Sequence, residues 1–257
     1  MESSRTRFPH ERHQQMLDLI VELKRVGTTE LASRLGISLA TIRRDLSVLE
    51  QAGLVARTHG GVVARGVGES ITEPLFLEKL RVHQNLKQRI GVAAAATVEN
   101  KKVVILDSGT TALAVARALA GRPLTIVTMD LKVAEAAASG DTEVHLVGGR
   151  VRNGYFSIVG AWVADALKDI RADTFFLAAD AIDETGITNS TQDEAQTKRI
   201  AIAQATRTVL VADHSKLNTS SFTAVCPLEA VDLFITDTDA EPLLAPYRGR
   251  FGAIQTV

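Results

Sequence analysis

The chain has almost no cysteine and no long apolar run. Cys226 is its only cysteine among 257 residues, which excludes an intrachain disulfide and a cluster of thiolate metal ligands. No stretch of about 18 uncharged apolar residues occurs, and the first ten residues are polar, so we expect neither a membrane span nor a signal peptide. These absences predict a cytoplasmic protein without a membrane partner.

Signatures of common cofactor and metal sites are also missing. The chain has no glycine-rich nucleotide loop ending in lysine and no three-glycine dinucleotide fingerprint, so neither ATP nor NAD is supported. Its six histidines show no metal-ligand spacing. We therefore expect no cofactor and no metal. The single tryptophan, Trp162, is expected to be a packing residue.

What the chain does have is a large apolar fraction and an uneven charge. It is 46% apolar and 23% charged, which is typical of a folded globular protein. Up to Gly66 it carries ten Lys and Arg residues against seven Asp and Glu residues, and beyond Gly66 the counts are 19 against 23. The first part is therefore modestly positive, which agrees with an anionic partner for that part of the chain.

The first 65 residues have the pattern of three short helices followed by a β-hairpin. Apolar residues recur at helical intervals in residues 11–24 and 30–35, and Gly36 supplies the tight turn that crossed helices need. After a third helix, residues 54–63 form two short strands around a glycine pair. This order predicts a winged helix-turn-helix domain over residues 8–65.

The third helix is the most informative segment. Ser38 is a good N-cap, and Ile42, Leu46 and Leu49 fall on one apolar face. The other faces carry polar and cationic side chains near the helix start, which suits a DNA major groove, while Asp45 is expected to pair with a nearby arginine. We expect base edges to be contacted by Ser38, Ala40, Thr41 and Arg44. We expect phosphates to be contacted by Arg43, Arg57 and His59.

Beyond a linker and connecting helix at residues 66–85, the pattern changes. Over residues 86–240, short apolar runs alternate with helical segments, which predicts an α/β domain with a mostly parallel sheet covered on both faces. Sheets of this kind bind ligands beyond the carboxyl ends of their strands. We therefore expect an effector-binding domain in this part of the chain.

Polar residues gather where these expected strands end. After the first, Asp107, Ser108, Gly109, Thr110 and Thr111 open into a helix, and hydroxyls beside free N–H groups form a cradle for phosphate. Carboxylates and a lysine at the other strand ends suit the hydroxyl groups of a polyol and the charge of an anion. Those further candidate residues are Asp130, Gly149, Asp180, Asp213 and Lys216.

Both parts resemble the DeoR-type bacterial transcription regulators. In the first part the shared residues are Glu11-Arg12, Thr41 to Leu46 and Arg57-Thr58-His59-Gly60-Gly61. In the second they are Asp107 to Thr111, Gly148-Gly149, Gly160, Gly186, Lys198, Asp213 to Lys216 and Ile235-Thr236-Asp237. The resemblance implies a sensor domain similar in fold to ribose-5-phosphate isomerase, with Lys198 in its effector site.

The resemblance also implies how the protein works. Its partners would be double-stranded operator DNA and a phosphorylated sugar, and the protein would be a homodimer or homotetramer that represses a carbohydrate-utilisation operon. The chain departs from the family at Met129, where asparagine is usual, at Ala178 and Ala181, where glycine is usual, and at His214, where serine is commoner. Met129 and Ala181 are expected to reshape the wall of the effector pocket.

Two other functions fit parts of the sequence. A sugar-phosphate isomerase or deaminase could use Asp180, Asp183 or Lys198 for proton transfer, although a DNA-reading domain has no place in such an enzyme. Alternatively, the second domain could serve oligomerisation alone and bind no ligand. Turnover of a sugar phosphate would favour the enzyme, and indifference to changes at Thr110 would favour the second alternative.

Overall fold

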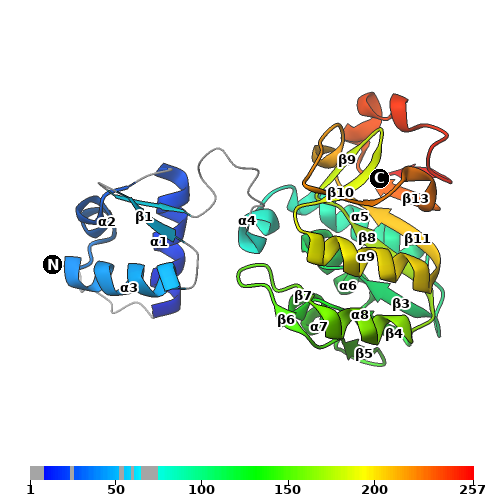
Figure 1. Ribbon diagram of the computed structural model, residues 1–257, viewed down its shortest axis with the longest axis horizontal. Helices are drawn as coiled ribbons and strands as arrows, with labels where there is room; N and C mark the ends of the chain where they lie inside the picture. Colours follow the sequence, from blue (N-terminus) through cyan, green and yellow to red (C-terminus); the bar gives the residue numbers. More distant parts are fainter. Residues whose placement is uncertain (1–8, 24–25, 52–54, 59–60, 65–74) are drawn as a thin grey trace. The chain divides into compact units, whose positions relative to one another are not determined.

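The chain divides into two compact units, Met1–Thr72 and Glu73–Val257 (Figure 1). The computed structural model describes residues 9–23, 26–51, 55–58, 61–64 and 75–257. The second unit thus extends to the C-terminal residue, beyond the expected range of 86–240.

The first unit contains the three expected helices and the expected hairpin. The strands pair in antiparallel fashion, and Val26 adds a bridge to Val62. Met16, Ile20 and Leu31 are buried in the core together with the apolar face of the third helix. The elements are α1 (Pro9–Leu23), α2 (Thr28–Leu35), α3 (Leu39–Gln51), β1 (Val55–Thr58) and β2 (Gly61–Ala64).

Two local features set the start of α3. Gly36 ends α2 with a φ of 65°, a left-handed conformation that glycine adopts without strain. The Ser38 hydroxyl oxygen then accepts a hydrogen bond from the Thr41 backbone N–H at 3.2 Å, which confirms Ser38 as the N-cap. The two side-chain hydroxyls are also hydrogen-bonded to each other at 2.9 Å.

A buried ion pair joins α1 to α3. Arg12 Nε lies 2.5 Å from one carboxylate oxygen of Asp45, and Arg12 Nη2 lies 3.0 Å from the other. His13 Nε2 lies 3.0 Å from the same carboxylate. Burial alone would raise the pKa of Asp45, but Arg12 and His13 outweigh it and hold that pKa below its usual value. The expectation of an arginine partner for Asp45 is confirmed.

Replacing Asp45 with asparagine should destabilise the first unit. The change removes the carboxylate charge that pairs with Arg12 and His13, and we expect a loss of about 1–3 kcal/mol, measured by urea unfolding or by hydrogen exchange of α1 amides in the full chain. Glu30→Gln is the control, because Glu30 and Arg34 form an exposed pair at 48% side-chain exposure each. Equal effects of the two variants would contradict this role.

The same pair gives the first unit a pH dependence of known sign. Because folding lowers the pKa of Asp45, its stabilisation is present above the ordinary aspartate pKa and is lost as the pH falls below it. Hydrogen exchange of α1 amides should therefore accelerate on acidification in the unchanged protein. In Asp45→Asn, hydrogen exchange of the α1 amides should accelerate less on acidification, because the Asp45 carboxylate is absent.

The second unit is built on one parallel sheet of seven strands, as the alternating pattern predicts. All of its neighbouring strands run in the same direction. Their order is β14-β13-β11-β8-β3-β4-β5. The strands are β3 (Val103–Leu106), β4 (Thr125–Thr128), β5 (Glu143–Leu146), β8 (Ala172–Ala178), β11 (Ala205–Val211), β13 (Leu233–Thr236) and β14 (Ile254–Thr256).

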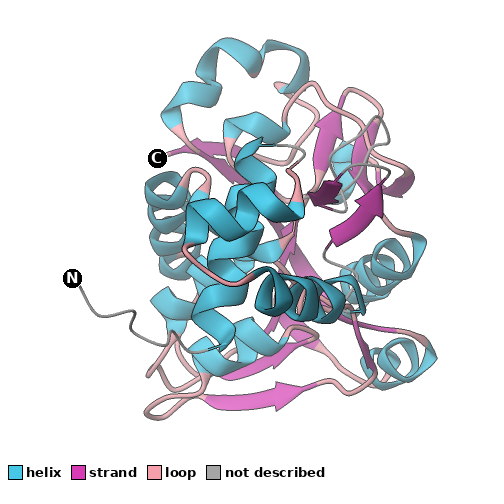
Figure 2. Cartoon of the chain, turned by 90° about the vertical axis from the view of Figure 1, so that its left-hand side faces the viewer, coloured by secondary structure: helices cyan, strands magenta, loops and turns pink. Residues whose placement is uncertain are grey.

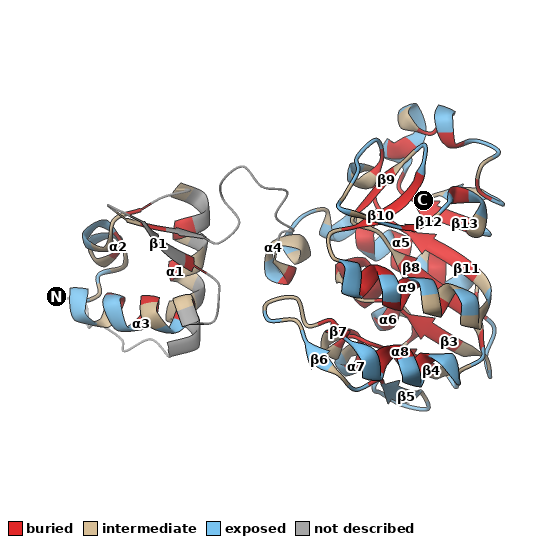
Figure 3. Cartoon of the chain, viewed as in Figure 1, coloured by how far each residue is buried: buried red, intermediate tan, exposed pale blue. Residues whose placement is uncertain are grey.

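Alternate residues of these strands enter two different cores. Ile105 and Phe175 contribute to the core on one face of the sheet, and Leu106 and Phe176 contribute to the core on the other. In Figure 3 the central strands of the sheet are accordingly buried, while the edge strand β5 is mostly exposed. One face is covered by α8 (Ala161–Lys168) and α9 (Gln192–Gln204). The other is covered by α5 (Gln84–Ala96), α6 (Thr110–Leu119) and α7 (Leu131–Ala137).

Several short elements were not expected, and they appear among the helices and strands of Figure 2. The connecting helix expected within residues 66–85 is the short α4 (Phe76–Arg81), which precedes α5. Among the elements that were not expected, β6 (Arg150–Val151) pairs with β7 (Ile158–Val159). A three-stranded antiparallel sheet consists of β9 (Ala181–Asp183), β10 (Gly186–Asn189) and β12 (Thr223–Cys226). The 3-10 helices are η1 (His214–Lys216), η2 (Leu228–Ala230), η3 (Thr238–Leu243) and η4 (Ala245–Tyr247).

Two further observations concern the surface. Trp162 is 78% exposed, so the expectation that it packs inside is wrong. Among the described residues, we find no helix with the length and apolar character that a membrane crossing requires.

Candidate functional site

The exposed side of α3 is the candidate DNA-reading surface. Ala40, Arg43 and Arg44 are exposed there, on the side away from the buried Ile42 and Leu46. The Ser38 and Thr41 hydroxyls already serve the helix cap, which gives both a structural role in addition to any contact with DNA.

Two exposed apolar side chains of α3 were not expected. Leu39 and Val48 are 40% and 47% exposed. Apolar side chains on a recognition helix match the methyl group of thymine. Of the wing residues, Arg57 lies on β1 opposite Val62, and His59 lies outside the described residues.

A pocket opens at the carboxyl ends of β3 and β8. These strands are neighbours at the centre of the sheet. The chain continues from β3 to β4 on one side and from β8 to β11 on the other. Ligands bind at such switch points in open parallel sheets. The turn after β3 contributes Ser108, Gly109, Thr110 and Thr111, and the end of β8 contributes Ala178, Ala179 and Asp180. The other lining residues are Phe76, Lys79, Lys87, Tyr155, Ser157, Asn189, Glu194, Lys198 and Lys216.

The turn after β3 has the form of an anion cradle. Gly109 is the N-cap of α6 with a φ of 100°, and no side chain caps this helix end. The first N–H groups of a helix lack intrahelical partners and carry partial positive charge, which favours phosphate. The Gly109 N–H itself is held by Asp130 at 3.1 Å, so the carboxylate fixes the turn.

Lys87 on α5 adds a buried positive charge to this pocket. Its Nζ donates hydrogen bonds to the carbonyl oxygens of Lys79 at 2.6 Å and Val82 at 2.8 Å. Among the described residues it forms no salt bridge, although Asp213 is near enough to favour its charged form. Burial, aided by the nearby Lys216 and Lys79, lowers its pKa to about 8.

Lys87 was not expected in the site, yet the sequence carries a signal for it. Lys87 precedes Ile90 by three residues and Ala94 by seven, so helical periodicity places it on the buried face of α5. A lysine on an apolar helix face is unusual because burying an ammonium group is costly. That cost marks the position as one where a charge is needed.

A second lysine, Lys198, lies at the floor of the pocket. Its Nζ lies 2.5 Å from the Asp107 carboxylate and donates a hydrogen bond to the Ala178 carbonyl oxygen at 2.9 Å. Burial alone would lower the pKa of Lys198, but Asp107 and Glu194 outweigh it and raise that pKa. Lys198 therefore stays charged and organises the pocket.

Two carboxylates face the same pocket. Asp180 pairs with Lys79 at 2.8 Å and also accepts hydrogen bonds from the Ser190 N–H and hydroxyl. Burial would raise the pKa of Asp180, but Lys79 and Ser190 outweigh it and hold that pKa far below its usual value. Glu194 accepts hydrogen bonds from Ser157 and Asn189 and is paired with Arg152. Both carboxylates are therefore ionised acceptors, as hydroxyl recognition requires.

Four residues expected in the effector site lie outside this lining. Asp107 is buried beneath it, and Asp130 is the buried N-cap of α7, where burial raises its pKa to about 6. Asp213 caps η1. Gly149 has no room for a side chain, since a Cβ would come within 2.8 Å of Val163. All four support the site through packing or hydrogen bonds.

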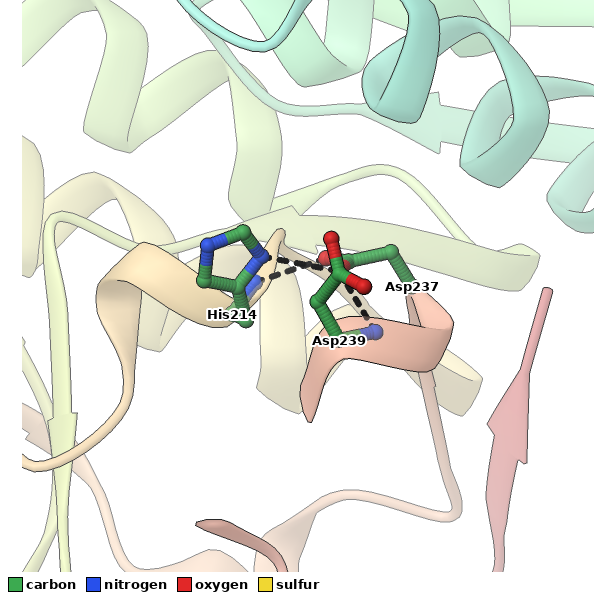
Figure 4. A group of neighbouring side chains, drawn as sticks. All are labelled: His214, Asp237 and Asp239. Carbon is green, nitrogen blue, oxygen red and sulfur yellow. Dashed lines mark hydrogen bonds and ion pairs between the residues drawn. The ribbon is translucent and has the colours of Figure 1, made fainter. Parts of the chain in front are cut away.

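The departures from the usual family residues have different surroundings from those expected. Met129 is buried in a core of the sheet and Ala181 is buried on β9, and neither lines the pocket. His214 lies beside Asp237 and Asp239 (Figure 4). Asp237 receives the His214 backbone N–H and the Asp239 backbone N–H, and its carboxylate is 2.8 Å from His214 Nδ1. The cluster therefore orients the His214 ring.

The pKa of Lys87 predicts a pH dependence of anion binding. The ammonium form is the one that attracts phosphate, so affinity for a phosphorylated ligand should fall as the pH rises through about 8. Between about pH 7 and about pH 9 we expect up to about tenfold weaker binding by isothermal titration calorimetry. Lys87→Met should bind weakly at both values. A ligand affinity that is independent of pH would contradict this role of Lys87.

Comparison with known proteins adds two family matches. Residues 12–65 match the DeoR-like helix-turn-helix domain, and residues 82–238 match the DeoR C terminal sensor domain. The chain is 36% identical to the HTH-type transcriptional regulator GlpR of Haloferax volcanii, over 90% of each chain. It is 33% identical to the regulator GolR of Listeria innocua, over 90% of this chain and 91% of that one.

A third relative is named as a repressor. The HTH-type transcriptional repressor GlcR of Bacillus subtilis is 31% identical over 90% of this chain and 89% of its own. Among solved structures, ribose 5-phosphate isomerase A from Methanocaldococcus jannaschii covers 53% of this chain and 55% of its own, with a TM-score of 0.40 and 19% identity. No functional conclusion follows from so partial a match.

Proposed function

Since the chain belongs to the DeoR family of DNA-binding transcriptional regulators, we propose that it represses a carbohydrate-utilisation operon and is released by a phosphorylated sugar. The pocket at the ends of β3 and β8 is the proposed input. The exposed side of α3 is the proposed output.

Lys87 carries the proposal for the ligand. A buried lysine that forms no salt bridge among the described residues is costly unless an anion completes its surroundings. It lines the pocket together with Lys216 and the open N-terminus of α6, which are suited to the phosphate group. Asp180 and Glu194 supply acceptors for the hydroxyl groups. A sugar monophosphate combines both chemistries in one molecule.

The protein is a regulator and not an enzyme, as its family membership shows. An isomerase or deaminase would need a group free to exchange a proton with its substrate. Lys198 is held charged between carboxylates, and Asp183 accepts hydrogen bonds from Thr185 and Gly186 in a hairpin turn. Lys198 therefore suits positioning of a ligand better than proton transfer, and Asp183 does not line the pocket.

The remaining partners follow from the way such domains read DNA. Helix-turn-helix proteins recognise two half-sites related by a two-fold axis, so we place two or four copies of this chain on the operator, as a homodimer or homotetramer. The operator is in the cytoplasm, where we therefore place the protein.

Arg44→Ala should remove operator selection. Arginine pairs with guanine through two hydrogen bonds worth about 1–3 kcal/mol, so the variant should lose its preference for selected DNA over random DNA in a gel shift. Arg117→Ala removes an exposed charge from α6 in the other unit and should leave that preference unchanged. Normal selection of the operator by Arg44→Ala would rule out this role for Arg44.

Thr110→Ala and Lys216→Ala should keep DNA binding but lose release by the effector. A panel of phosphorylated and unphosphorylated sugars is screened first by thermal shift, since a ligand that binds the folded state raises the melting temperature. Gel shifts with the same panel then measure release. If both variants respond like the unchanged protein, the pocket is not the sensor, and the domain serves oligomerisation or binds elsewhere.

A further inference from the structure

The segment Leu75–His83, here called the strap, is the first described part of the second unit. It contains α4 and runs into α5. A helix of six residues has little stability of its own, so its position depends on the contacts that hold it. Among the described residues, contacts at its start, middle and end hold the strap, and each of these leads to the pocket.

The first contact anchors the start of the strap. The Phe76 N–H donates a hydrogen bond to the Gly154 carbonyl oxygen at 3.1 Å. The Phe76 ring meets the Phe156 ring edge-to-face, with 5.4 Å between centroids. Phe76 lines the pocket, and so does Tyr155, which lies between the two anchoring residues of the β6–β7 turn. The β6–β7 turn therefore contacts the strap and also contributes a residue to the pocket.

The second contact lies in the middle of the strap. Lys79 Nζ and Asp180 Oδ1 are 2.8 Å apart, with side-chain exposures of 19% and 15%. Both residues line the pocket. The ion pair is therefore made of two groups that an incoming sugar phosphate would itself attract, Asp180 through hydroxyls and Lys79 through the phosphate.

The third contact holds the end of the strap. Lys87 donates hydrogen bonds to the Lys79 and Val82 carbonyl oxygens, which satisfies acceptors left free at the end of a helix. The His83 ring lies 5.0 Å from the His214 ring, centroid to centroid. His214 belongs to η1, which also carries the pocket residue Lys216. The groups proposed to bind phosphate therefore also hold the strap.

We propose that the strap transmits effector binding to the DNA-reading unit. Without effector, the Lys79–Asp180 pair and the Lys87 hydrogen bonds hold the strap closed, and this is the form that binds DNA. The effector binds Asp180 through its hydroxyls and Lys87 through its phosphate. These interactions separate the Lys79–Asp180 pair and loosen the strap. The inference rests on the proposed function, because it gives that same pocket its route to the DNA.

The chain connectivity supports this choice of element. Residues 65–74 join the strap directly to β2 of the first unit, so any force on that linker from the second unit is exerted through Leu75 and α4. In the proposal the strap is a two-state element, whose hydrogen bonds, ring contacts and ion pair are made in one state and broken in the other. Its two states would be favoured by DNA and by effector respectively.

The test changes residues that contact the strap or belong to it and that do not line the pocket. Phe156→Ala and His83→Ala remove the two ring contacts, while Trp162→Ala removes an exposed ring elsewhere in the same unit and serves as the control. In the ligand-free full chain, we expect the two strap variants to bind selected operator DNA about fivefold or more weakly. The control should bind it as the unchanged protein does.

Binding of inorganic phosphate separates loss of coupling from loss of the pocket. Measured by isothermal titration calorimetry, both strap variants should bind phosphate at least as tightly as the unchanged protein does, because a loosened strap favours the ligand-bound form. Phe156→Leu keeps an apolar contact with Phe76 and should largely restore DNA affinity, which separates lost coupling from misfolding. Hydrogen exchange at residues 76–81 of the unchanged protein should accelerate when a releasing sugar phosphate from the screening panel is added.

The outcomes distinguish the two levels of the proposal. If the unchanged protein binds phosphate and is released from DNA by the panel, but both strap variants show its DNA affinity and its release, the strap is not the transmitter. If no member of the panel releases the unchanged protein, the proposed function is wrong and the strap proposal falls with it.

Discussion

The buried ion pair between Lys198 and Asp107 is the interaction on which the rest of the sensor depends. Asp107 accepts hydrogen bonds from the Ser108 and Ala178 N–H groups, and Lys198 also binds the Ala178 carbonyl oxygen. The pair therefore ties together the ends of β3 and β8 and helix α9. Without it, the turn after β3, which is the candidate phosphate site, would not be tied to the end of β8, which carries Asp180. The other charges of the pocket, on Lys87, Asp180 and Glu194, act around this fixed centre.

The periodicity of the sequence was enough to predict the sheet and its covering helices. Strands such as Val103–Leu106 are apolar at every position because alternate residues enter two cores, and short runs of this kind are typical of parallel sheets. The β6–β7 pair and the bounds of the short connecting helix α4 could not be predicted in this way. Their two to six residues are too few to show a period, and they are stabilised by contacts distant in sequence, such as Phe76 with Phe156.

The site was predictable only in part, for a related reason. The hydroxyls of Ser108 to Thr111 were found because a strand end followed by a helix start is a local pattern. Lys79 was missed because its partner, Asp180, lies 101 positions away in the sequence. Glu194 was missed because its partner, Ser157, lies 37 positions away. Asp130 and Asp213 were expected in the pocket, since a polar strand end does not reveal whether a carboxylate meets a ligand or caps a helix. Only the hydrogen bonds decide that.

The central claim is that one pocket and one recognition helix belong to the same switch. Coupling between two sites is reciprocal, so an effector that weakens DNA binding must itself bind more weakly when DNA is present. The most direct measurement is the affinity of the releasing sugar phosphate for the protein with and without saturating operator DNA. The account predicts weaker binding on DNA, by the same factor by which the sugar phosphate weakens DNA binding. An equal affinity in both conditions would contradict it.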